Sequence, residues 1–499
     1  MNPRLYALFV AVLFVTAITS ENPFQADEHF QIVEFASFKV GLTPRELLPW
    51  EAAAEIRPWF LPGVAFLVMK ALRLVPGADV FTCAMLLRGI AAAASLVAIG
   101  RLLRYTGARE APVTFRAQCA FVFTAAFVPY LSVRFSSEGL SASLFAIAFT
   151  LLEPARPDQP PPDRGTGPLL GGVLLAAAFQ ARSQTILMIA GYAAWRLLVA
   201  RAPARSWALP TLGFLVGNAA GFAIDAWGYD HAVFPFWGYV RANLVEGVAA
   251  KFSREPFFAY LYLPVGNLFA LPAAVALVGS FVFWVRRPRD PFTWIMAPSF
   301  VGFSLIAHKE ERFVFPMALF AALAVAPAFV GTRMFSLRRT WLARVVWGVQ
   351  AILMIGMAVH PVQWRERVPL ARAMTRTLGA TDVVYMDDAR STAFPALRGR
   401  FSEREFAEGC EVPRGAYVLT SRAGPPLPGA DLVYTEWPLG TRAMGLRAAI
   451  QSVADDARSR FGPVVQPVGW YGLYRVEVAR VGERPCPERV FVPIATRRP

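Results

Sequence analysis

The amino-acid sequence predicts an α-helical polytopic membrane protein with a C-terminal soluble α/β domain. Of its 499 residues, 56% are hydrophobic and only 17% are charged, and the mean hydropathy is +0.42. A soluble chain usually carries about a quarter charged residues, so this composition argues against a cytosolic enzyme and against a disordered chain. The excess of 50 Lys and Arg over 35 Asp and Glu is typical of basic loops beside anionic lipid head groups. We therefore expect membrane lipid, and no nucleic acid, as a partner.

The first apolar run covers residues 5–19 and follows a short basic segment that holds Arg4. It fits either a cleaved signal peptide or a first membrane helix. The many later apolar runs and the lack of an A-x-A cleavage site favour a helix with its N-terminus inside. Residues 20–59 are rich in charged side chains, so this stretch must lie outside the hydrocarbon.

Ten further apolar segments bring the predicted number of transmembrane helices to about eleven. They cover residues 60–76, 80–100, 117–133, 137–152, 169–199, 207–224, 264–286, 291–307, 314–330 and 341–360. An odd number of crossings places the C-terminus outside. Arginine clusters at residues 196–205, 286–289 and 333–344 then fall on the inner side, as the positive-inside rule requires.

One loop disagrees with this topology. Arg101, Arg104, Arg109 and Arg116 fall on the outer side of the membrane. Division of segment 169–199 at Arg182 would move that loop inside, but it would also place the acidic first loop inside. The prediction therefore keeps the segment undivided and assigns residues 1–360 to the transmembrane domain.

Residues 361–499 have the composition of a soluble α/β domain, and their number lies within the usual range for one domain. Short β-rich runs occur at residues 383–386, 416–419, 432–434 and 472–476, with a helical stretch at 443–461. Because the last crossing ends outside, this domain is expected to be extracytoplasmic.

The most specific charged motif consists of five consecutive ionisable residues between two apolar segments: His308, Lys309, Glu310, Glu311 and Arg312. They cannot be buried cheaply in hydrocarbon, so they lie at an interface. A solvated turn with snorkelling side chains explains them as well. The alternative is a site in which the three cations bind a phosphate and the two carboxylates position them. The shared outer side with the acidic first loop favours the site.

Asp27 and Glu28 lie just outside the first helix. One of these carboxylates could act as the general base for a hydroxyl nucleophile, although acidic residues are also favoured at helix N-termini by the helix dipole. Arg134 and Glu138 form another charged cluster, and Arg182 lies inside an apolar segment. An intramembrane arginine is costly unless it faces a cavity or a partner.

The external loop at residues 225–263 is rich in Phe, Trp and Tyr. Aromatic residues of this density form interfacial belts, and they also suit contacts with sugar rings and acyl chains. No P-loop, HExxH or GxSxG motif occurs, which argues against an ATP-driven pump, a zinc protease and an α/β-hydrolase. Four cysteines without a C-x-x-C pair and four histidines predict no metal site.

Four segments resemble the lipid-linked mannosyltransferases of N-glycan and GPI-anchor assembly, glycosyltransferase family 22. They are HKEERFVFP (308–316), DEHFQIVEFASFKVG (27–41), WEAAAEIRPWFLPG (50–63) and the aromatic loop closed by KFSREPFFAYLYLP (251–264). The resemblance runs from about residue 20 to residue 330 and implies a GT-C fold with an extracytoplasmic active site. Lys251-Phe252-Ser253 departs from the Tyr-Gly pair that usually follows the Phe, which leaves the acceptor open, and the tail after residue 360 matches nothing in the family.

The resemblance also implies roles for single residues. Asp27, with Glu28 as its alternate, would be the base that activates an acceptor hydroxyl for inverting attack on the anomeric carbon. The groups implied to bind the donor phosphate are His308, Lys309, Arg312, Arg182 and Arg134; those that support them are Glu310, Glu311 and Glu138; those on the acceptor loop are Asp225, Trp237 and Asn243.

The predicted function is transfer of a hexose, mannose in the first place, from a polyprenyl-phosphate donor to a glycan or glycolipid acceptor. The lipid-linked sugar would be a co-substrate, and no metal or other cofactor is expected. A transferase of another sugar and a transporter of lipid-linked sugars are the alternatives, but a transporter would place its charges near the bilayer midplane in broken helices. The Ala-, Arg- and Pro-rich composition is typical of a bacterial protein, so we expect the bacterial inner membrane, or the endoplasmic reticulum membrane for a eukaryotic chain.

Overall fold

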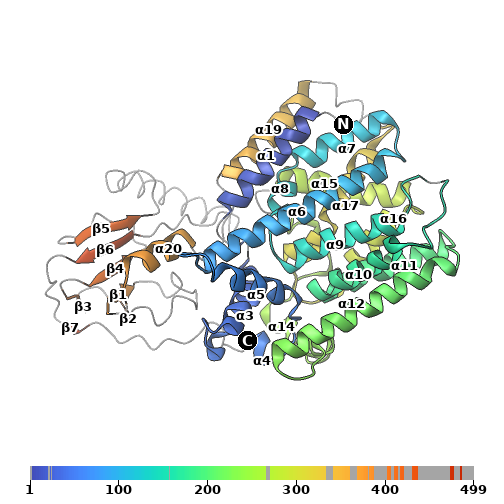
Figure 1. The fold of residues 1–499 in the computed structure, drawn as a ribbon. Helices are drawn as coiled ribbons and strands as arrows, with labels where there is room; N and C mark the ends of the chain where they lie inside the picture. The colour runs from blue at the N-terminus through green and yellow to red at the C-terminus, as the bar shows by residue number, and fades with distance from the viewer. Residues whose placement is uncertain are drawn as a thin grey trace.

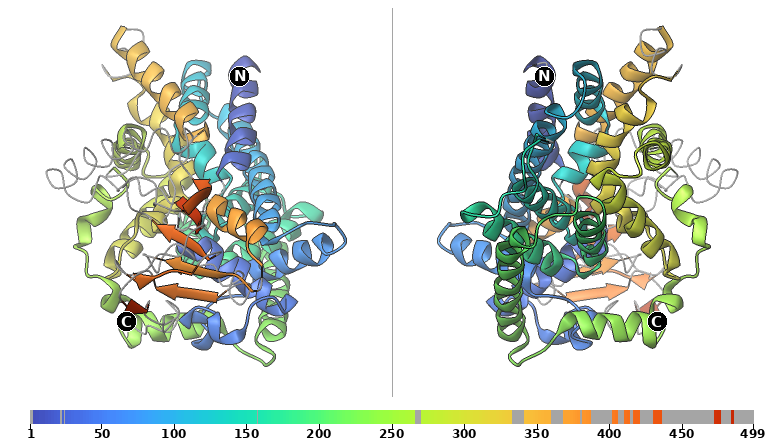
Figure 2. Two further views of the ribbon diagram at one scale, coloured as in Figure 1. Left: turned by 90° about the vertical axis from the view of Figure 1, so that its left-hand side faces the viewer. Right: turned by 90° about the vertical axis from the view of Figure 1, so that its right-hand side faces the viewer.

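Helices form the first part of the chain and strands occur after it in the described residues (Figures 1 and 2). The structure is a computed structural model. It describes residues 3–332 except 21, 22, 24, 157 and 266–269, and then 341–359, 368–379, 381–386, 402–405, 410–413, 416–420, 430–435, 472–476 and 484–485. The predicted helix at 443–461 lies outside the described residues.

The helices follow the predicted apolar segments in most places. In chain order they are α1 (Pro3–Thr19), α2 (Ala26–Glu28), α3 (Glu34–Val40), α4 (Trp50–Ala53), α5 (Phe60–Leu72), α6 (Val80–Gly107), α7 (Pro112–Thr124), α8 (Phe127–Ser132), α9 (Ser137–Leu152), α10 (Thr166–Ala181), α11 (Ile186–Leu198), α12 (Arg205–Tyr229), α13 (Pro235–Val240), α14 (Ala249–Phe252), α15 (Ala270–Arg286), α16 (Pro291–Leu305), α17 (Ala318–Phe329), α19 (Trp341–Val359) and α20 (Val368–Thr377). Short π or 3-10 turns lie at His29–Val33, Arg45–Leu47, Ser183–Thr185, Arg241–Val245, Phe257–Leu261 and Glu311–Met317.

Several described helices have the apolar character of membrane segments. Val80–Gly107, Arg205–Tyr229 and Glu311–Phe329 are long and apolar enough to cross a bilayer, and shorter apolar helices include α1, α9 and α10. These helices support the predicted polytopic membrane architecture. The number of eleven crossings stays a prediction.

Local sequence signals begin several helices where the structure has them. Asp79 and Thr82 form a reciprocal capping box at the start of α6, in which the Thr82 backbone N–H donates to Asp79 Oδ1 at 2.7 Å. Ser136 accepts a hydrogen bond from the backbone N–H of Gly139 at the start of α9. Such caps satisfy N–H groups that a helix end leaves without an intrahelical partner.

An aromatic core holds the middle of the helical part together. Phe149 of α9, Tyr192 of α11, Phe292 of α16 and Phe320 of α17 are buried within one cluster. The ring centroids of Phe292 and Phe320 are 5.1 Å apart in an edge-to-face arrangement, a geometry that stabilises aromatic pairs beyond their buried area. This core lets α9, α11, α16 and α17 carry the site residues at their ends.

Charged loops meet at one end of the helical part. Arg287 pairs with Glu110, the Nε of Arg196 lies 3.2 Å from Oε1 of Glu153, and Arg109 donates to the carbonyl oxygen of the residue after Glu153. The loops after α6, α9, α11 and α15 therefore lie together. The prediction that residues 101–116 lie on the opposite side of the membrane from the arginine loops at 196–205 and 286–289 is wrong.

Two segments explain this error. Residues 169–199 form two helices, α10 and α11, because Arg182 adopts an extended backbone conformation between them. Residues 60–72 form α5, which packs against α3 and the start of α6. A break inside one apolar run reverses the chain without a change of composition, so hydropathy alone does not detect it.

A five-stranded mixed sheet follows the helical part. Its order is β2 (Ser402–Glu405), β1 (Val383–Met386), β4 (Tyr417–Thr420), β6 (Gly472–Val476) and β5 (Ala430–Thr435), and β3 (Cys410–Glu411) pairs separately with β7 (Arg484–Pro485). β1 pairs in parallel with β2 and β4, whereas β6 is antiparallel to β4 and β5. The four predicted strands are confirmed. The sheet lies beside α20, whose Val368 packs on Phe81 of α6 (Figure 1).

Glycine allows the backbones of α10 and α12 to touch. A Cβ atom at Gly172 would lie 2.0 Å from the carbonyl oxygen of Pro210, and one at Gly213 would lie 2.1 Å from that of Leu169. Small residues that permit such close approach are typical of helix pairs in membranes.

We therefore expect Gly172→Ala to separate α10 from α12 and to destabilise the protein by about 1–3 kcal/mol, the usual cost of overpacking. Gly167→Ala is the control, because a Cβ at Gly167 of the same helix meets nothing within 4 Å. Unfolding in mixed micelles would measure both variants. Equal stability of the two would contradict the proposed backbone contact.

Candidate active site

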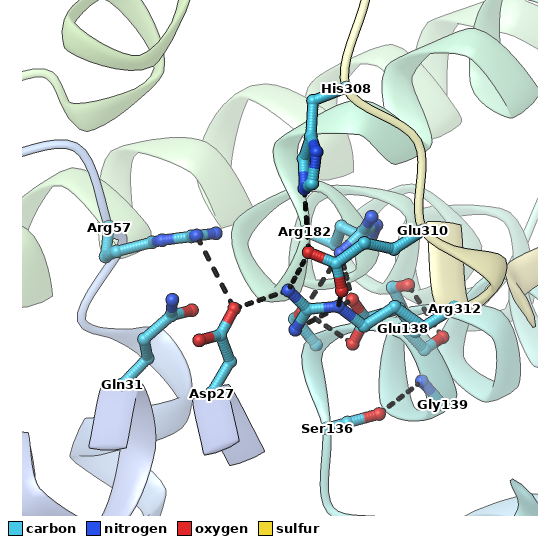
Figure 3. A network of polar contacts seen from close by, with 12 residues as sticks. Asp27, Gln31, Arg57, Ser136, Glu138, Gly139, Arg182, His308, Glu310 and Arg312 are labelled. Carbon is cyan, nitrogen blue, oxygen red and sulfur yellow. Dashed lines mark hydrogen bonds and ion pairs between the residues drawn. The ribbon is translucent and has the colours of Figure 1, made fainter. Parts of the chain in front are cut away.

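Arg312 lies among three carboxylates that come from distant parts of the chain (Figure 3). Its Nη2 lies 2.6 Å from Oδ2 of Asp27, its Nε 2.7 Å from Oε2 of Glu310, and its Nη1 4.0 Å from Oε1 of Glu138. The Arg312 side chain is only 12% exposed, so these ion pairs are weakly screened by water. One guanidinium therefore joins α2, α9 and the loop before α17.

This geometry changes the expectation for Arg312. The sequence predicts it as a ligand of the donor phosphate, but its donors already face carboxylates of the protein. A phosphate would have to compete with Asp27 and Glu310 for the same N–H groups. Arg312 is thus placed to hold Asp27 rather than to bind a second anion.

Asp27 is held by one of its two carboxylate oxygens. Oδ2 receives Arg312 and lies 4.0 Å from Nη2 of Arg57. Among the described residues, no partner is assigned to Oδ1. The side chain is 30% exposed and lines a hollow. Asp27 is therefore oriented by arginine while one oxygen remains accessible to a ligand.

Arg57 belongs to the site, although the sequence analysis assigned it no role. Its Nη2 lies 3.5 Å from Oε1 of Glu51, which also accepts a hydrogen bond from Gln31 Nε2 at 2.9 Å. Burial raises the pKa of Glu51, and the charge of Arg57 opposes that rise. The guanidinium of Arg57 lies 6.0 Å from the ring centroid of Tyr239. The sequence signal for Arg57 was its position in WEAAAEIRPWFLPG (50–63), one of the segments that resemble the mannosyltransferases.

Arg182 occupies the break between α10 and α11. Its Nη1 lies 2.5 Å from Oε1 of Glu138 and 3.2 Å from Oγ of Ser137. The residue is only 4% exposed, and within the described part of the chain its Nε and Nη2 have no hydrogen-bond partner. Buried donors without an acceptor are rare in proteins. Arg182 therefore has two buried donors without a partner beside the polar hollow that it lines.

His308 connects two loops through both of its ring nitrogens. Nε2 lies 2.8 Å from Oε1 of Glu310, and Nδ1 lies 2.7 Å from Oγ of Ser253. Burial alone would raise the pKa of Glu310, but the charge of Arg312 and the hydrogen bond with His308 lower it to about 2. Glu310 is therefore ionised across the physiological range and supports Arg312.

Glu28 and Arg134 form a second contact between the first external segment and the start of α9. Nη1 of Arg134 lies 3.5 Å from Oε2 of Glu28, and its Nη2 donates to Ser20. The guanidinium stacks at 4.3 Å on the ring of Tyr130. Arg134 thus anchors the chain just after α1 and holds Glu28 beside Asp27.

Lys309 and Glu311 have surroundings that differ from those of Arg312. Nζ of Lys309 donates to the backbone oxygens of Glu255 at 3.1 Å and Ile306 at 2.5 Å. Glu311 is one of the residues that line an apolar groove. Their predicted roles toward a phosphate stay predictions that this geometry does not favour.

The three predicted acceptor-loop residues do not meet at the site. Asp225 lies within α12, is 2% exposed and accepts a hydrogen bond from the Trp59 backbone N–H at 2.6 Å, so it fixes the start of α5. Trp237 is 61% exposed, and Asn243 donates to the Tyr239 backbone. The loop begins after Tyr229, not at Asp225. Tyr239 is the aromatic residue of this loop that lines the hollow.

Three neighbouring hollows extend from the ion pairs to an apolar groove. The polar hollow, with about 540 Å³ of empty space, is lined among others by Asp27, Gln31, Arg57, Glu138, Arg182 and Tyr239. The middle hollow shares Glu138 with it and Phe315 with the third. The third, an apolar groove of about 730 Å³, lies between α8, α15, α16 and α17. This change from a polar hollow to an apolar groove fits a ligand with a charged head and an apolar tail.

Metal binding has no support in the described residues. Within them, no group of three or more His, Cys, Asp or Glu side chains is arranged to hold a metal ion. The carboxylates near Arg312 are already compensated by arginine. The expectation of a metal-independent site stays a prediction.

Comparisons with known proteins agree with the predicted family. The model of the Alg9-like mannosyltransferase family matches residues 4–365. GPI mannosyltransferase 3 of Yarrowia lipolytica (strain CLIB 122 / E 150) is 28% identical over 200 residues, which are 40% of this chain and 37% of that protein. The chain thus aligns with little more than a third of this curated relative.

A solved structure has a similar fold. It is ArnT from Cupriavidus metallidurans bound to undecaprenyl phosphate, with 14% identity and a TM-score of 0.53 over 87% of this chain and 97% of that chain. The apo state of the same protein gives a TM-score of 0.49. At this identity the likeness concerns the fold alone, and it supports the predicted helical GT-C architecture.

The Arg312 cluster leads to a prediction about stability. Arg312→Gln leaves three carboxylates near one another without their shared cation, so we expect a loss of about 3–5 kcal/mol, as for other broken buried ion pairs. The control is Arg241→Gln, because Arg241 pairs with Glu246 on an exposed surface, where a pair contributes about 0–1 kcal/mol. Unfolding in mixed micelles compares the two, and similar small losses would contradict a central role for Arg312.

Proposed function

The chain belongs to the Alg9-like mannosyltransferase family, and from this premise we propose that it transfers a hexose, mannose in the first place, from a polyprenyl-phosphate donor to a hydroxyl of a glycan or glycolipid. The observation that carries the proposal is the polar hollow lined by Asp27, Arg57 and Arg182. Sugar transfer from a lipid phosphate needs a base for the acceptor and cations for the leaving group. The hollow brings both together.

Asp27 is the proposed general base. Arg312 holds its Oδ2, so its Oδ1 is left for the acceptor hydroxyl. As the acceptor oxygen forms its bond to the anomeric carbon, its proton passes to Asp27. The bond between that carbon and the phosphate oxygen breaks, and the electron pair leaves with the phosphate. Attack from the opposite face inverts the configuration. Glu28 remains the alternate, with Arg134 as its partner.

Arg182 is the proposed principal ligand of the donor phosphate. Its Nε and Nη2 are two buried donors without an acceptor among the described residues, and the planar guanidinium fork matches two phosphate oxygens. Arg57 lines the same hollow and would supply further positive charge. Lys309 instead fixes the loop before α17 through backbone oxygens. Arg134 and His308 act on the carboxylates beside the site.

The apolar groove between α15, α16 and α17 is the proposed site of the polyprenyl chain. Its lining residues include Leu277, Met296, Phe300 and Ala321, and burial of apolar surface drives such binding. The similar ArnT structure was solved with undecaprenyl phosphate, which supports a lipid phosphate as the donor's leaving group. The loop at residues 230–263 would contact the acceptor, with Tyr239 facing the hollow.

We also propose a membrane topology. Crossings at α1, α6, α7 with α8, α9, α10, α11, α12, α15, α16, α17 and α19 amount to eleven, with α5 outside. The arginine loops at one end of the helices then lie inside, as the positive-inside rule favours. The polar hollow and the C-terminal strands lie on the extracytoplasmic side. The bacterial cell membrane remains the proposed location.

The proposed base can be tested by Asp27→Asn, which keeps the size of the side chain and removes its ability to accept a proton. We expect transfer to fall by about 10²–10⁴-fold in a folded protein. The assay supplies labelled polyprenyl-phosphate mannose and a lipid or glycan extract of the source cells to purified protein. Glu28→Gln is the matched control and should keep most activity. A larger loss of transfer in Glu28→Gln than in Asp27→Asn would identify Glu28 as the base.

Arg182→Lys tests the phosphate ligand, because it keeps a charge beside Glu138 but removes the guanidinium fork. We expect polyprenyl-phosphate affinity to fall about tenfold to a hundredfold, the equivalent of one charged hydrogen bond. Arg196→Lys is the control: Arg196 is also buried beside a glutamate, but at the opposite end of the helices. Calorimetric titration with polyprenyl phosphate measures both. Equal affinity of the two variants would exclude Arg182 as the phosphate ligand.

A further inference from the structure

A continuous series of side-chain contacts runs from the aromatic loop to Asp27. Ser253 Oγ lies 2.7 Å from His308 Nδ1, and His308 Nε2 lies 2.8 Å from Glu310 Oε1. Glu310 Oε2 lies 2.7 Å from Arg312 Nε, and Arg312 Nη2 lies 2.6 Å from Asp27 Oδ2. Figure 3 shows the part from His308 to Asp27. Each link joins atoms at hydrogen-bond distance.

We propose that Ser253 is a positioning residue for the general base, acting through His308, Glu310 and Arg312 on the carboxylate of Asp27. The inference rests on the proposed role of Asp27 as base. Ser253 itself contacts neither of the hollows lined by Asp27 or Arg312. Its effect on transfer is therefore indirect.

The chemistry of the imidazole ring explains why a hydroxyl is needed at residue 253. Nε2 faces a carboxylate oxygen of Glu310, so it carries a hydrogen and donates it. In a neutral ring Nδ1 is then an acceptor, and the hydroxyl of Ser253 donates to it. In an imidazolium Nδ1 donates instead, and the same hydroxyl accepts. A hydroxyl serves both states because it is donor and acceptor, whereas a methyl group serves neither.

The ring of His308 is fixed from a second direction as well. Its centroid lies 5.7 Å from that of Phe313, with the two planes at 76°. Loss of the Ser253 hydroxyl would remove the contact that sets the ring's rotation. Glu310 would then lose its alignment with Arg312, and Oδ2 of Asp27 would lose its fixed partner.

The two loops remain docked without this side-chain contact. The backbone N–H of Glu255 donates to the carbonyl oxygen of Ala307 at 3.0 Å, and Lys309 Nζ donates to the carbonyl oxygen of Glu255 at 3.1 Å. Ser253→Ala therefore removes the link to His308 while the neighbouring contacts hold the loop in place. This separates a positioning role from a purely structural one.

Ser253 would connect the aromatic loop, on the proposed acceptor side, to Asp27, the proposed base. Ser253 belongs to the same loop as Tyr239, which lines the polar hollow. The position of this loop and the orientation of Asp27 are joined through His308. Sugar transfer would then be fastest when this loop has the position that it has in this structure.

The test is a double-mutant cycle in the mannose-transfer assay with full-length protein. We expect Ser253→Ala to lower kcat about tenfold to a hundredfold, as misorientation of a reacting group does, with the donor KM unchanged. Ser253→Thr keeps the hydroxyl and should restore most of the rate. Ser253→Ala combined with His308→Ala should be no slower than His308→Ala alone, because residues that act as one unit are not additive. Lys70→Ala is the control and should keep the wild-type rate, because Lys70 is exposed on α5 and lines none of the three hollows.

A spectroscopic measurement checks the link independently of transfer. The chain has four histidines, so selective ¹⁵N-histidine labelling with a His308→Ala reference identifies the ring signals of His308. Ser253→Ala should shift its Nδ1 signal, and Ser253→Thr should not. Additive losses in the cycle, a wild-type rate for Ser253→Ala, or an unchanged Nδ1 signal would overturn the positioning role. Absence of mannose transfer by the wild-type protein would instead remove the proposed function.

Discussion

The fold around the candidate site depends on one constraint: the buried guanidinium of Arg312 must be compensated by carboxylates. Arg312 is mostly buried, and an uncompensated charge in such surroundings is costly. Asp27, Glu138 and Glu310 meet this requirement from three separate segments. The first external segment, the start of α9 and the loop before α17 must therefore come together whenever the chain folds. The same contacts that neutralise Arg312 also leave one oxygen of Asp27 without a partner among the described residues, so folding and the proposed catalysis depend on one set of ion pairs.

The surfaces around this cluster change from polar to apolar in one direction. Arg57 and Arg182 line the polar hollow, and the groove beyond Phe315 is almost entirely hydrocarbon. A lipid-linked sugar has the same order of properties, with a phosphate between its sugar and its tail. In the proposed function, the charged side chains would match the phosphate of the donor and the apolar surface would match its chain.

The opposite end of the helices uses similar ion pairs for a different purpose. Glu153 with Arg196 and Glu110 with Arg287 bind neighbouring loops together, far along the helices from Asp27. These four residues line none of the three hollows. Arg182 differs because it lines the polar hollow, where its Nε and Nη2 have no acceptor among the described residues. Position beside a hollow, and not burial or charge alone, thus separates Arg182 from the arginines at the opposite end of the helices.

The membrane architecture and the strands of the C-terminal part could be predicted from the sequence, because composition and periodicity are properties of neighbouring residues. Local motifs and the family resemblance also made Asp27, Glu28, Arg182 and the segment from His308 to Arg312 candidates for the site. The tertiary structure was needed to show which of these charges pair with other groups of the protein and which line a hollow. It showed that Arg312 is paired with carboxylates, that Lys309 donates to backbone oxygens and that Asp225 accepts from the backbone at the start of α5. It also placed Arg57 beside the polar hollow and Ser253 next to His308. It also divided residues 169–199 into two helices. These outcomes depend on pairings between residues tens to hundreds of positions apart, and one sequence carries no direct record of such pairings.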